Sequence, residues 1–283
     1  MPDFSYSQNT SGAAQSSDTP ATHGFPARYV GIDIGSTATK VAVMDEVQGE
    51  LRVRQTFLIP TGYSSVDAAG RALDLLEQAG YERGGFTCVA TGYGRISVPY
   101  ADKAVTEITC HGRGAAHLFG PEGIVVDVGG QDTKVMEVQG GAVKRFVMND
   151  KCSAGTGRFL EVMADRLGVS QAELAHMAEK GEPTVISNMC TVFAESEVIS
   201  LVGRGEPREN IARGVFDSVV KRVAGLMAQV PALPGTPRFL TGGLCDNPYF
   251  ARCLGQAVGC QVATSPQARY AGAIGAAISA SRL

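Results

Sequence analysis

The sequence lacks three features that would place it in a familiar class of protein. It contains no run of about 18 apolar residues, so no transmembrane helix is expected. Its formal net charge is only −3, which indicates neither nucleic-acid binding nor a polybasic membrane surface. No basic segment leads into an apolar core near its beginning, so no signal peptide is expected.

The sequence also lacks the cysteine pattern of a disulfide-bonded secreted domain. Its seven cysteines are odd in number and irregularly spaced, so a reducing cytoplasm is the simplest compartment. Most cysteines in such a compartment are small buried hydrophobic residues. This is the expectation for Cys88, Cys110, Cys245, Cys253 and Cys260. The histidines are expected to be structural or surface residues rather than ligands: His111, His117 and His176.

The chain is long enough, at 283 residues, for one large or two medium domains with true cores. Residues 1–27 are polar and show no apolar periodicity, so we predict a disordered tail there. Beyond the tail, short β-like runs dominate the first half and helical patterns the second. The predicted helices of the second half include a capping box at Ser170 and Glu173 and a long helix over 207–230. Late in the chain we expect a helix over 247–254 and a strand over 258–262.

One short pattern occurs twice. Residues 33–40 (DIGSTATK) and 127–134 (DVGGQDTK) share the form D-I/V-G-x-x-x-T-K and begin 94 residues apart. Each copy follows a hydrophobic strand and precedes an alternating one. A single copy is compatible with an ordinary β-hairpin, but two copies with matched flanks predict two similar half-domains.

Each of these turns suits phosphate binding. Glycine lets backbone N–H groups approach phosphate oxygens without a Cβ clash, and neighbouring hydroxyls can donate to the same oxygens. The aspartate at the end of the preceding strand can hold a hydrated Mg²⁺. Two facing turns would clasp a polyphosphate, and a late Gly-Gly pair would accept a base or ribose. The candidate nucleotide-binding residues are therefore Gly35, Ser36, Thr37, Lys40, Gly129, Gly130, Gly242, Gly243 and Leu244.

Two lysines and three polar residues complete this set of hypotheses. Lys40 and Lys134 fit solvated strand residues better than phosphate ligands, although Lys40 is kept among the candidates. We assign Asp33 and Asp127 to the organisation of Mg²⁺ and the attacking water. Gln131 could orient that water, as a glutamine does in some nucleoside triphosphatases.

This layout resembles the acetate kinase, sugar kinase, heat-shock chaperone and actin superfamily. The resemblance implies an α/β, actin-like ATPase fold, in which two duplicated ribonuclease H-like domains bind ATP in the cleft between them. The phosphate loops of that superfamily match residues 33–39 and 127–133, and its adenosine motif matches 241–244. We expect the first half-domain to comprise 28–118 and 265–283 and the second to comprise 119–264.

Cys152 and Cys190 differ from the other cysteines because each lies just ahead of a predicted helix, over 155–167 and 191–204. A helix N-terminus favours thiolates and anionic clusters. Two thiolates are too few for a closed four-thiolate site in one chain, but a two-fold dimer would supply the other two. From the residues alone, two buried structural thiols remain the alternative. The glycines of 149–158 are also compatible with a phosphate loop.

Longer motifs resemble the ATP-dependent activators of 2-hydroxyacyl-CoA dehydratases. They are 149–161 (NDKCSAGTGRFLE), 189–200 (MCTVFAESEVIS), 90–95 (ATGYGR), 101–108 (ADKAVTEI) and 264–277 (TSPQARYAGAIGAA). The resemblance runs from about Tyr29 to the last residue. It implies a homodimer that holds one 4Fe-4S cluster through Cys152 and Cys190 of both protomers.

The same resemblance implies that ATP hydrolysis drives a one-electron transfer to a partner iron–sulfur enzyme. That partner is a 2-hydroxyacyl-CoA dehydratase or, in a related branch, a benzoyl-CoA reductase. A ferredoxin or flavodoxin is the expected reductant. Residues 129–132 and 149–152 fit the dehydratase branch better. Hydrolysis is expected to change the angle between the two helices that follow the cysteines.

Two other classes of function are compatible with the fold. A small-molecule kinase would need a substrate pocket with its own base, and the sequence shows no obvious one. A non-catalytic nucleotide switch, like actin, would have no use for two cysteines at helix starts. Glu195 and Glu197, on the second of these helices, are expected to cap it or to pair along it.

Overall fold

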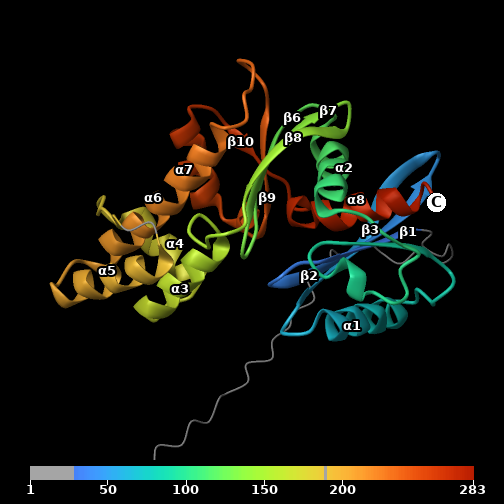
Figure 1. Cartoon of the computed structure of the whole chain (residues 1–283), viewed down its shortest axis with the longest axis horizontal. Helices are drawn as coiled ribbons and strands as arrows, with labels where there is room; N and C mark the ends of the chain where they lie inside the picture. Colours follow the sequence, from blue (N-terminus) through green and yellow to red (C-terminus); the bar gives the residue numbers. More distant parts are fainter. Residues whose placement is uncertain (1–28, 188–189) are drawn as a thin grey trace, which may run out of the picture.

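Two mixed sheets of five strands organise the chain, and the computed structural model describes them within residues 29–187 and 190–283 (Figure 1). The predicted tail and the first residue of the motif at 189–200 lie outside these described residues. The first sheet has the order β3-β2-β1-β4-β5. Its strands are β1 (Tyr29–Ile34), β2 (Ala38–Val47), β3 (Glu50–Pro60), β4 (Thr87–Thr91) and β5 (Lys103–Ala104).

The second sheet repeats the first. Its order, β8-β7-β6-β9-β10, has the same sequence of antiparallel and parallel neighbours. Its strands are β6 (Gly123–Val128), β7 (Thr133–Gln139), β8 (Ala142–Asn149), β9 (Arg238–Gly242) and β10 (Val262–Ala263). The register repeats as well, because Asp33 pairs with Lys40 and Asp127 pairs with Lys134. The predicted duplication is therefore confirmed.

Eight α-helices and three short 3₁₀ turns surround the sheets in the described part of the chain. The α-helices are α1 (Ser65–Gln78), α2 (Glu107–Phe119), α3 (Gly157–Leu167), α4 (Gln171–Lys180), α5 (Thr191–Gly203), α6 (Arg208–Met227), α7 (Pro248–Val258) and α8 (Ala271–Ala280). The 3₁₀ turns are η1 (Arg95–Ser97), η2 (Gly243–Asp246) and η3 (Ala268–Tyr270). None of the helices within the described ranges is long and apolar enough to cross a membrane.

Helices cover both faces of each sheet. On the first sheet, α1 packs against one face and α8 against the other. On the second sheet, α2 covers one face, while α6 and α7 cover the other. Helices α2 and α8 pack against each other between the two sheets (Figure 1). A Cβ at Gly275 of α8 would collide with the Cys110 carbonyl of α2, so glycine lets these two backbones touch.

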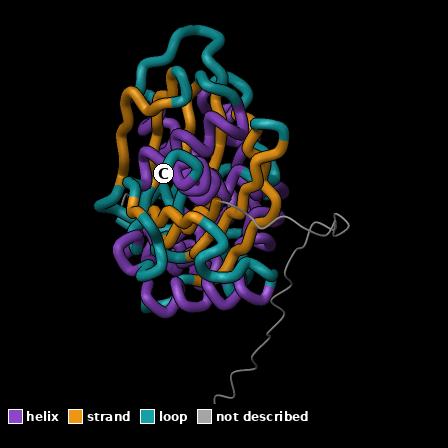
Figure 2. Tube along the Cα trace, turned by 90° about the vertical axis from the view of Figure 1, so that its right-hand side faces the viewer, coloured by secondary structure: helices purple, strands orange, loops and turns teal. Residues whose placement is uncertain are grey.

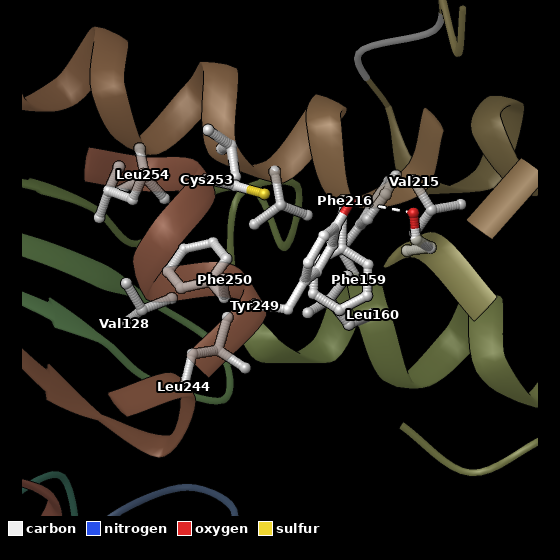
Figure 3. Packing of buried hydrophobic residues seen from close by; sticks show 14 of the residues in the cluster. Val128, Phe159, Leu160, Val215, Phe216, Leu244, Tyr249, Phe250, Cys253 and Leu254 are labelled. Carbon is white, nitrogen blue, oxygen red and sulfur yellow. Dashed lines mark hydrogen bonds between the residues drawn. The ribbon is translucent and has the colours of Figure 1, made fainter. Parts of the chain in front are cut away.

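The layers recur in the perpendicular view, where strands and helices alternate through the molecule (Figure 2). The larger core lies in the second half and joins α3 to α6 and α7 (Figure 3). There Phe216 and Tyr249 meet edge to face with ring centroids 5.1 Å apart. The Tyr249 hydroxyl donates a 3.2 Å hydrogen bond to the Ala178 carbonyl. These contacts join α4, α6 and α7, and α3 packs into the same core through Phe159 and Leu160.

The structure differs from the expected elements mainly near the end of the second half. Helix α7 continues to Val258 and is ended by Gly259 in the left-handed conformation (φ 70°). The strand predicted over 258–262 is therefore wrong, and only Val262 and Ala263 form β10. The capping box at Ser170 and Glu173 is confirmed.

Candidate functional site

The two repeated turns close in the same way and face each other. In the β1–β2 turn the Gly35 N–H donates to the Ala38 carbonyl at 3.2 Å, and in the β6–β7 turn the Gly129 N–H donates to the Asp132 carbonyl at 2.9 Å. A Cβ added to Gly130 would lie 3.0 Å from the Thr37 Cβ, so the second turn rests against the first. The structure thus brings the predicted phosphate-binding residues of both turns together.

A glycine stands beside each aspartate. Gly92, directly after β4 (φ 85°), and Gly242, the last residue of β9 (φ 79°), both have left-handed backbones that favour glycine. A Cβ at Gly92 would strike Oδ1 of Asp33, and one at Gly242 would strike Oδ1 of Asp127. Gly242 of the late glycine motif and Gly92 in the first half therefore leave the space that the two aspartate side chains occupy.

The remaining candidates of the nucleotide site lie at different depths. Gly243 is exposed, whereas Leu244 packs into the core of the second half. Gln131 is exposed at the tip of the β6–β7 turn. The side chain of Lys40 is about one-fifth exposed at 19%, and its Nζ lies 3.5 Å from Asp33 Oδ2.

Lys134 is buried at the centre of an ion-pair network. Its Nζ lies 2.7 Å from Asp132 Oδ2, 2.8 Å from Glu107 Oε1 and 3.4 Å from Asp127 Oδ2. The expectation that Lys134 is a solvated strand residue is wrong. Strand β7 is covered by α2, so its side chain points into the molecule and meets the carboxylates there.

The charges in this network determine its protonation. Burial lowers the pKa of Lys134, but the carboxylates of Asp127, Glu107 and Asp132 outweigh burial and raise that pKa. Burial raises the pKa of Asp127, but His111 and Lys134 outweigh it and hold the pKa below its usual range. The pKa of Glu107 is raised, mainly by burial. Asp127 is therefore held as an anion beside a charged lysine.

Asp33 has a different environment. It is buried, and its Oδ1 has no hydrogen-bond partner among the described residues. A buried carboxylate oxygen without a partner is costly unless a ligand, ion or water satisfies it. Carboxylate oxygens are the ligands that Mg²⁺ prefers, usually through retained waters. The residues at this position therefore fit a hydrated Mg²⁺ next to the two turns.

The sequence reasoning missed two residues of this site, Glu107 and His111 on α2. Glu107 contacts Lys134, and the imidazole of His111 lies 3.7 Å from Asp127 Oδ2. The available signal was their spacing of four residues, which places both on one face of the helix. His111 is buried, which agrees with only the first part of the expectation that it is a structural or surface residue and not a ligand-binding one.

Cys152 and Cys190 are both exposed, and the residues that follow them in the chain are in contact. The hydroxyls of the next residues, Ser153 and Thr191, are hydrogen-bonded at 2.8 Å. Cys190 is the N-cap residue of α5, as expected, whereas Cys152 precedes α3 by a turn of several residues. Paired, accessible thiols fit half of the ligand set of a four-thiolate cluster. Within the described ranges, no group of three or more potential ligands could hold a metal ion.

The turn that carries Cys152 (residues 149–156, the cysteine turn) is bonded directly to the β6–β7 turn, the second of the two predicted phosphate turns. The N–H groups of Gly157 and Arg158 donate to the carbonyls of Gly129 and Gly130 at 2.9 and 2.8 Å. The buried Thr156 hydroxyl lies 3.1 Å from the Gly130 carbonyl and 2.6 Å from the Ser153 carbonyl. The first N–H groups of α3 are thus occupied by hydrogen bonds to the β6–β7 turn.

The other predicted roles in this region are partly confirmed. The buried cysteines are Cys88, Cys110, Cys245 and Cys253, whereas Cys260 is half-buried because it lies near the surface beyond α7. Glu195 pairs with Arg166 of α3, and Glu197 accepts hydrogen bonds from Ser187. Glu195 therefore pairs across to α3 and not along its own helix as one of the two expectations had it, whereas Glu197 joins α5 to the loop before it.

Two duplicated sheets whose aspartate-bearing turns face each other define an ATPase of the actin-like class. The model of the BadF/BadG/BcrA/BcrD ATPase family matches residues 30–280, and the chain belongs to this family. The resemblance to dehydratase activators is confirmed at the level of the family.

Its relatives include proteins with assigned activities. The (R)-2-hydroxyglutaryl-CoA dehydratase activating ATPase of Acidaminococcus fermentans is 41% identical over 88% of this chain and 95% of its own. The crystal structure of component A of that organism's dehydratase superposes with a TM-score of 0.83, at 39% identity over 90% and 97% of the chains.

Two further relatives extend the comparison. The activator of the 2-hydroxyisocaproyl-CoA dehydratase from Clostridium difficile, solved with bound ADPNP, has a TM-score of 0.81 at 34% identity over 89% and 93% of the chains. A benzoyl-CoA reductase component of Thauera aromatica is 32% identical over 88% of this chain and 91% of its own.

Proposed function

We propose that this protein is an ATP-hydrolysing one-electron donor that activates a 2-hydroxyacyl-CoA dehydratase. Two copies of the chain would hold one 4Fe-4S cluster through Cys152 and Cys190 of each. The cluster, when bound, would supply one electron at low potential to the iron–sulfur partner. A cytoplasmic location and a ferredoxin or flavodoxin as reductant belong to the same proposal.

One observation carries this proposal: the bonds between the second phosphate turn and the cysteine turn. Gly129 and Gly130 accept hydrogen bonds from the first N–H groups of α3. Asn149 Nδ2 also donates to the Cys152 carbonyl at 2.9 Å. A shift of the phosphate turn on nucleotide binding or hydrolysis would therefore move the start of α3 and the Cys152 backbone together. A kinase or a nucleotide switch has no need for such a connection to paired thiols.

The residues of the two turns have complementary tasks in this proposal. Backbone N–H groups and hydroxyls of Gly35, Ser36, Thr37, Gly129 and Gly130 hold the phosphates. The paired aspartates hold the hydrated Mg²⁺ and the attacking water, which Gln131 orients. Asp127→Asn tests this division, because it removes one negative charge at nearly constant shape. Unchanged ATP turnover in this variant would remove Asp127 from the mechanism.

Iron content tests the cysteine assignment. The protein purified without oxygen should be brown and contain about four irons per dimer. Cys152→Ala and Cys190→Ala should each lose iron and shift the dimer toward monomer, while Cys260→Ala, a half-buried cysteine elsewhere, should retain both. A colourless protein after anaerobic reconstitution with iron and sulfide would refute the cluster and leave a kinase or switch.

A second candidate differs only in the partner. Similarity to the benzoyl-CoA reductase component favours an aryl-CoA reductase as electron acceptor, although the dehydratase activating ATPase is more similar, at 41% against 32% identity. Mixing the reduced protein and ATP with each purified partner distinguishes the two. We expect substrate turnover with a 2-hydroxyacyl-CoA dehydratase and none with the reductase core.

A further inference from the structure

The two aspartates related by the duplication, Asp33 and Asp127, have different neighbours. Each aspartate faces a helix that lies between the sheets. Helix α8 presents Gly272 to Asp33, where an added Cβ would lie 2.7 Å from Oδ2. Helix α2 presents His111 to Asp127, with Nδ1 of the imidazole 3.7 Å from Oδ2. The same place in the repeated fold thus holds a bare backbone in one half and an aromatic ring in the other.

The ring of His111 is fixed from its far side. Its Nε2 lies 2.7 Å from the hydroxyl of Thr241, which is fully buried on β9. The Thr241 hydroxyl also lies 3.3 Å from the Val126 carbonyl. When this hydroxyl donates to Nε2, the proton of the neutral ring is on Nδ1. This chain of bonds runs from α2 through β9 to β6. It leaves the Nδ1 edge of the ring facing Asp127, the residue that follows Val126.

Asp127 is therefore held between two groups. Lys134 Nζ approaches its Oδ2 at 3.4 Å from β7, and His111 approaches the same oxygen from α2. Both partners are at most 4% exposed. Among the described residues, Asp33 forms an ion pair with Lys40 alone, at 3.5 Å. Two catalytic candidates related by duplication thus differ in how firmly the fold orients them.

We propose that His111 is a positioning residue that fixes the Asp127 carboxylate for ATP hydrolysis, an orienting contact that Asp33 lacks. This inference rests on the proposed role of Asp127. His111 touches neither phosphate nor metal in it, and its effect passes through Asp127. A buried ring on a rigid three-element support is the kind of second layer that such orientation needs.

The test uses the full-length dimer purified without oxygen and the substitution His111→Gln. The glutamine amide keeps a hydrogen-bonding group for the Thr241 hydroxyl and removes the ring edge that faces Asp127. The matched control is His117→Gln, the same substitution on the same helix away from the aspartates. We expect kcat for ATP to fall about tenfold or more in H111Q, with Kd for ADPNP within about threefold of wild type. H117Q should retain both values.

A double-substitution cycle separates positioning from a structural effect. H111Q should add less than about twofold to the loss caused by Asp127→Asn, because its target is already gone. It should multiply with the loss caused by Asp33→Asn. Equal multiplication with both, or a loss no larger than in H117Q, would overturn the proposal. If D127N alone leaves turnover unchanged, the assignment of Asp127 fails and this inference fails with it, while iron binding still tests the cluster separately.

Discussion

Replacing Gly130 by alanine should weaken nucleotide binding by forcing the two phosphate turns apart. The new Cβ would collide with the Thr37 hydroxyl and lie 3.0 Å from the Thr37 Cβ. Because the Thr37 side chain is exposed, it can rotate and relieve the first contact, but rotation does not move its Cβ. Gly130 does not have a positive φ, so alanine adds no backbone strain.

The magnitude follows from the remaining contact. Overpacking by one methyl group costs roughly 1–3 kcal/mol, and the freedom of Thr37 places this case at about 1–2 kcal/mol. The free variant can relieve this contact by opening the two turns, and binding a nucleotide between them then requires closing them again at that cost. The Kd for ADPNP should therefore rise about 5- to 30-fold, measured by titration calorimetry on the full-length protein. The melting temperature should change little, because the turns lie outside the cores.

Two further variants test whether the loss comes from the contact between the turns. Gly70→Ala on α1, where an added Cβ meets no atom within 4 Å, should leave Kd unchanged. In a Thr37→Gly background, Gly130→Ala should cost less than about twofold, because the colliding side chain is absent. The same loss in both backgrounds, or full affinity of the single variant, would refute the contact between the turns.

Three further predictions concern stability and thiol access. Lys134→Met leaves three carboxylates without their shared cation and should lower the free energy of unfolding, measured in urea, by about 3–5 kcal/mol. Because the pKa of Lys134 is raised in the folded state, the stabilisation that Lys134 gives the wild type should persist from neutral pH to about pH 10 and be lost only above it. In iron-free protein at pH 8, Cys152 and Cys190 should react with a thiol reagent within minutes, whereas Cys88, whose pKa burial raises to about 12, should react only on unfolding. Ser170→Ala removes the N-cap of α4 and should cost about 1 kcal/mol in the same urea assay.

Local patterns predicted most of the fold because each depends on neighbours in the chain. The strands around both turns, the capping box at Ser170 and the helix that begins at Cys190 follow from short-range spacing and cap chemistry. The error over 258–262 also has a local origin. Apolar residues at the end of a helix and in a short strand form similar patterns. Here they continue α7 to Val258, and Gly259 ends that helix, so no strand begins at Val258.

By itself the sequence determined the duplication, the two turns and the two cysteines, because these are properties of composition and spacing. Only the tertiary structure decided which charges meet. It buried Lys134 among carboxylates from β6, the β6–β7 turn and α2, and it placed His111 against Asp127 but Gly272 against Asp33. It also bonded the start of α3 to Gly129 and Gly130. Such contacts join residues far apart in the chain, and their geometry depends on how the helices pack across the sheets rather than on any periodicity along them.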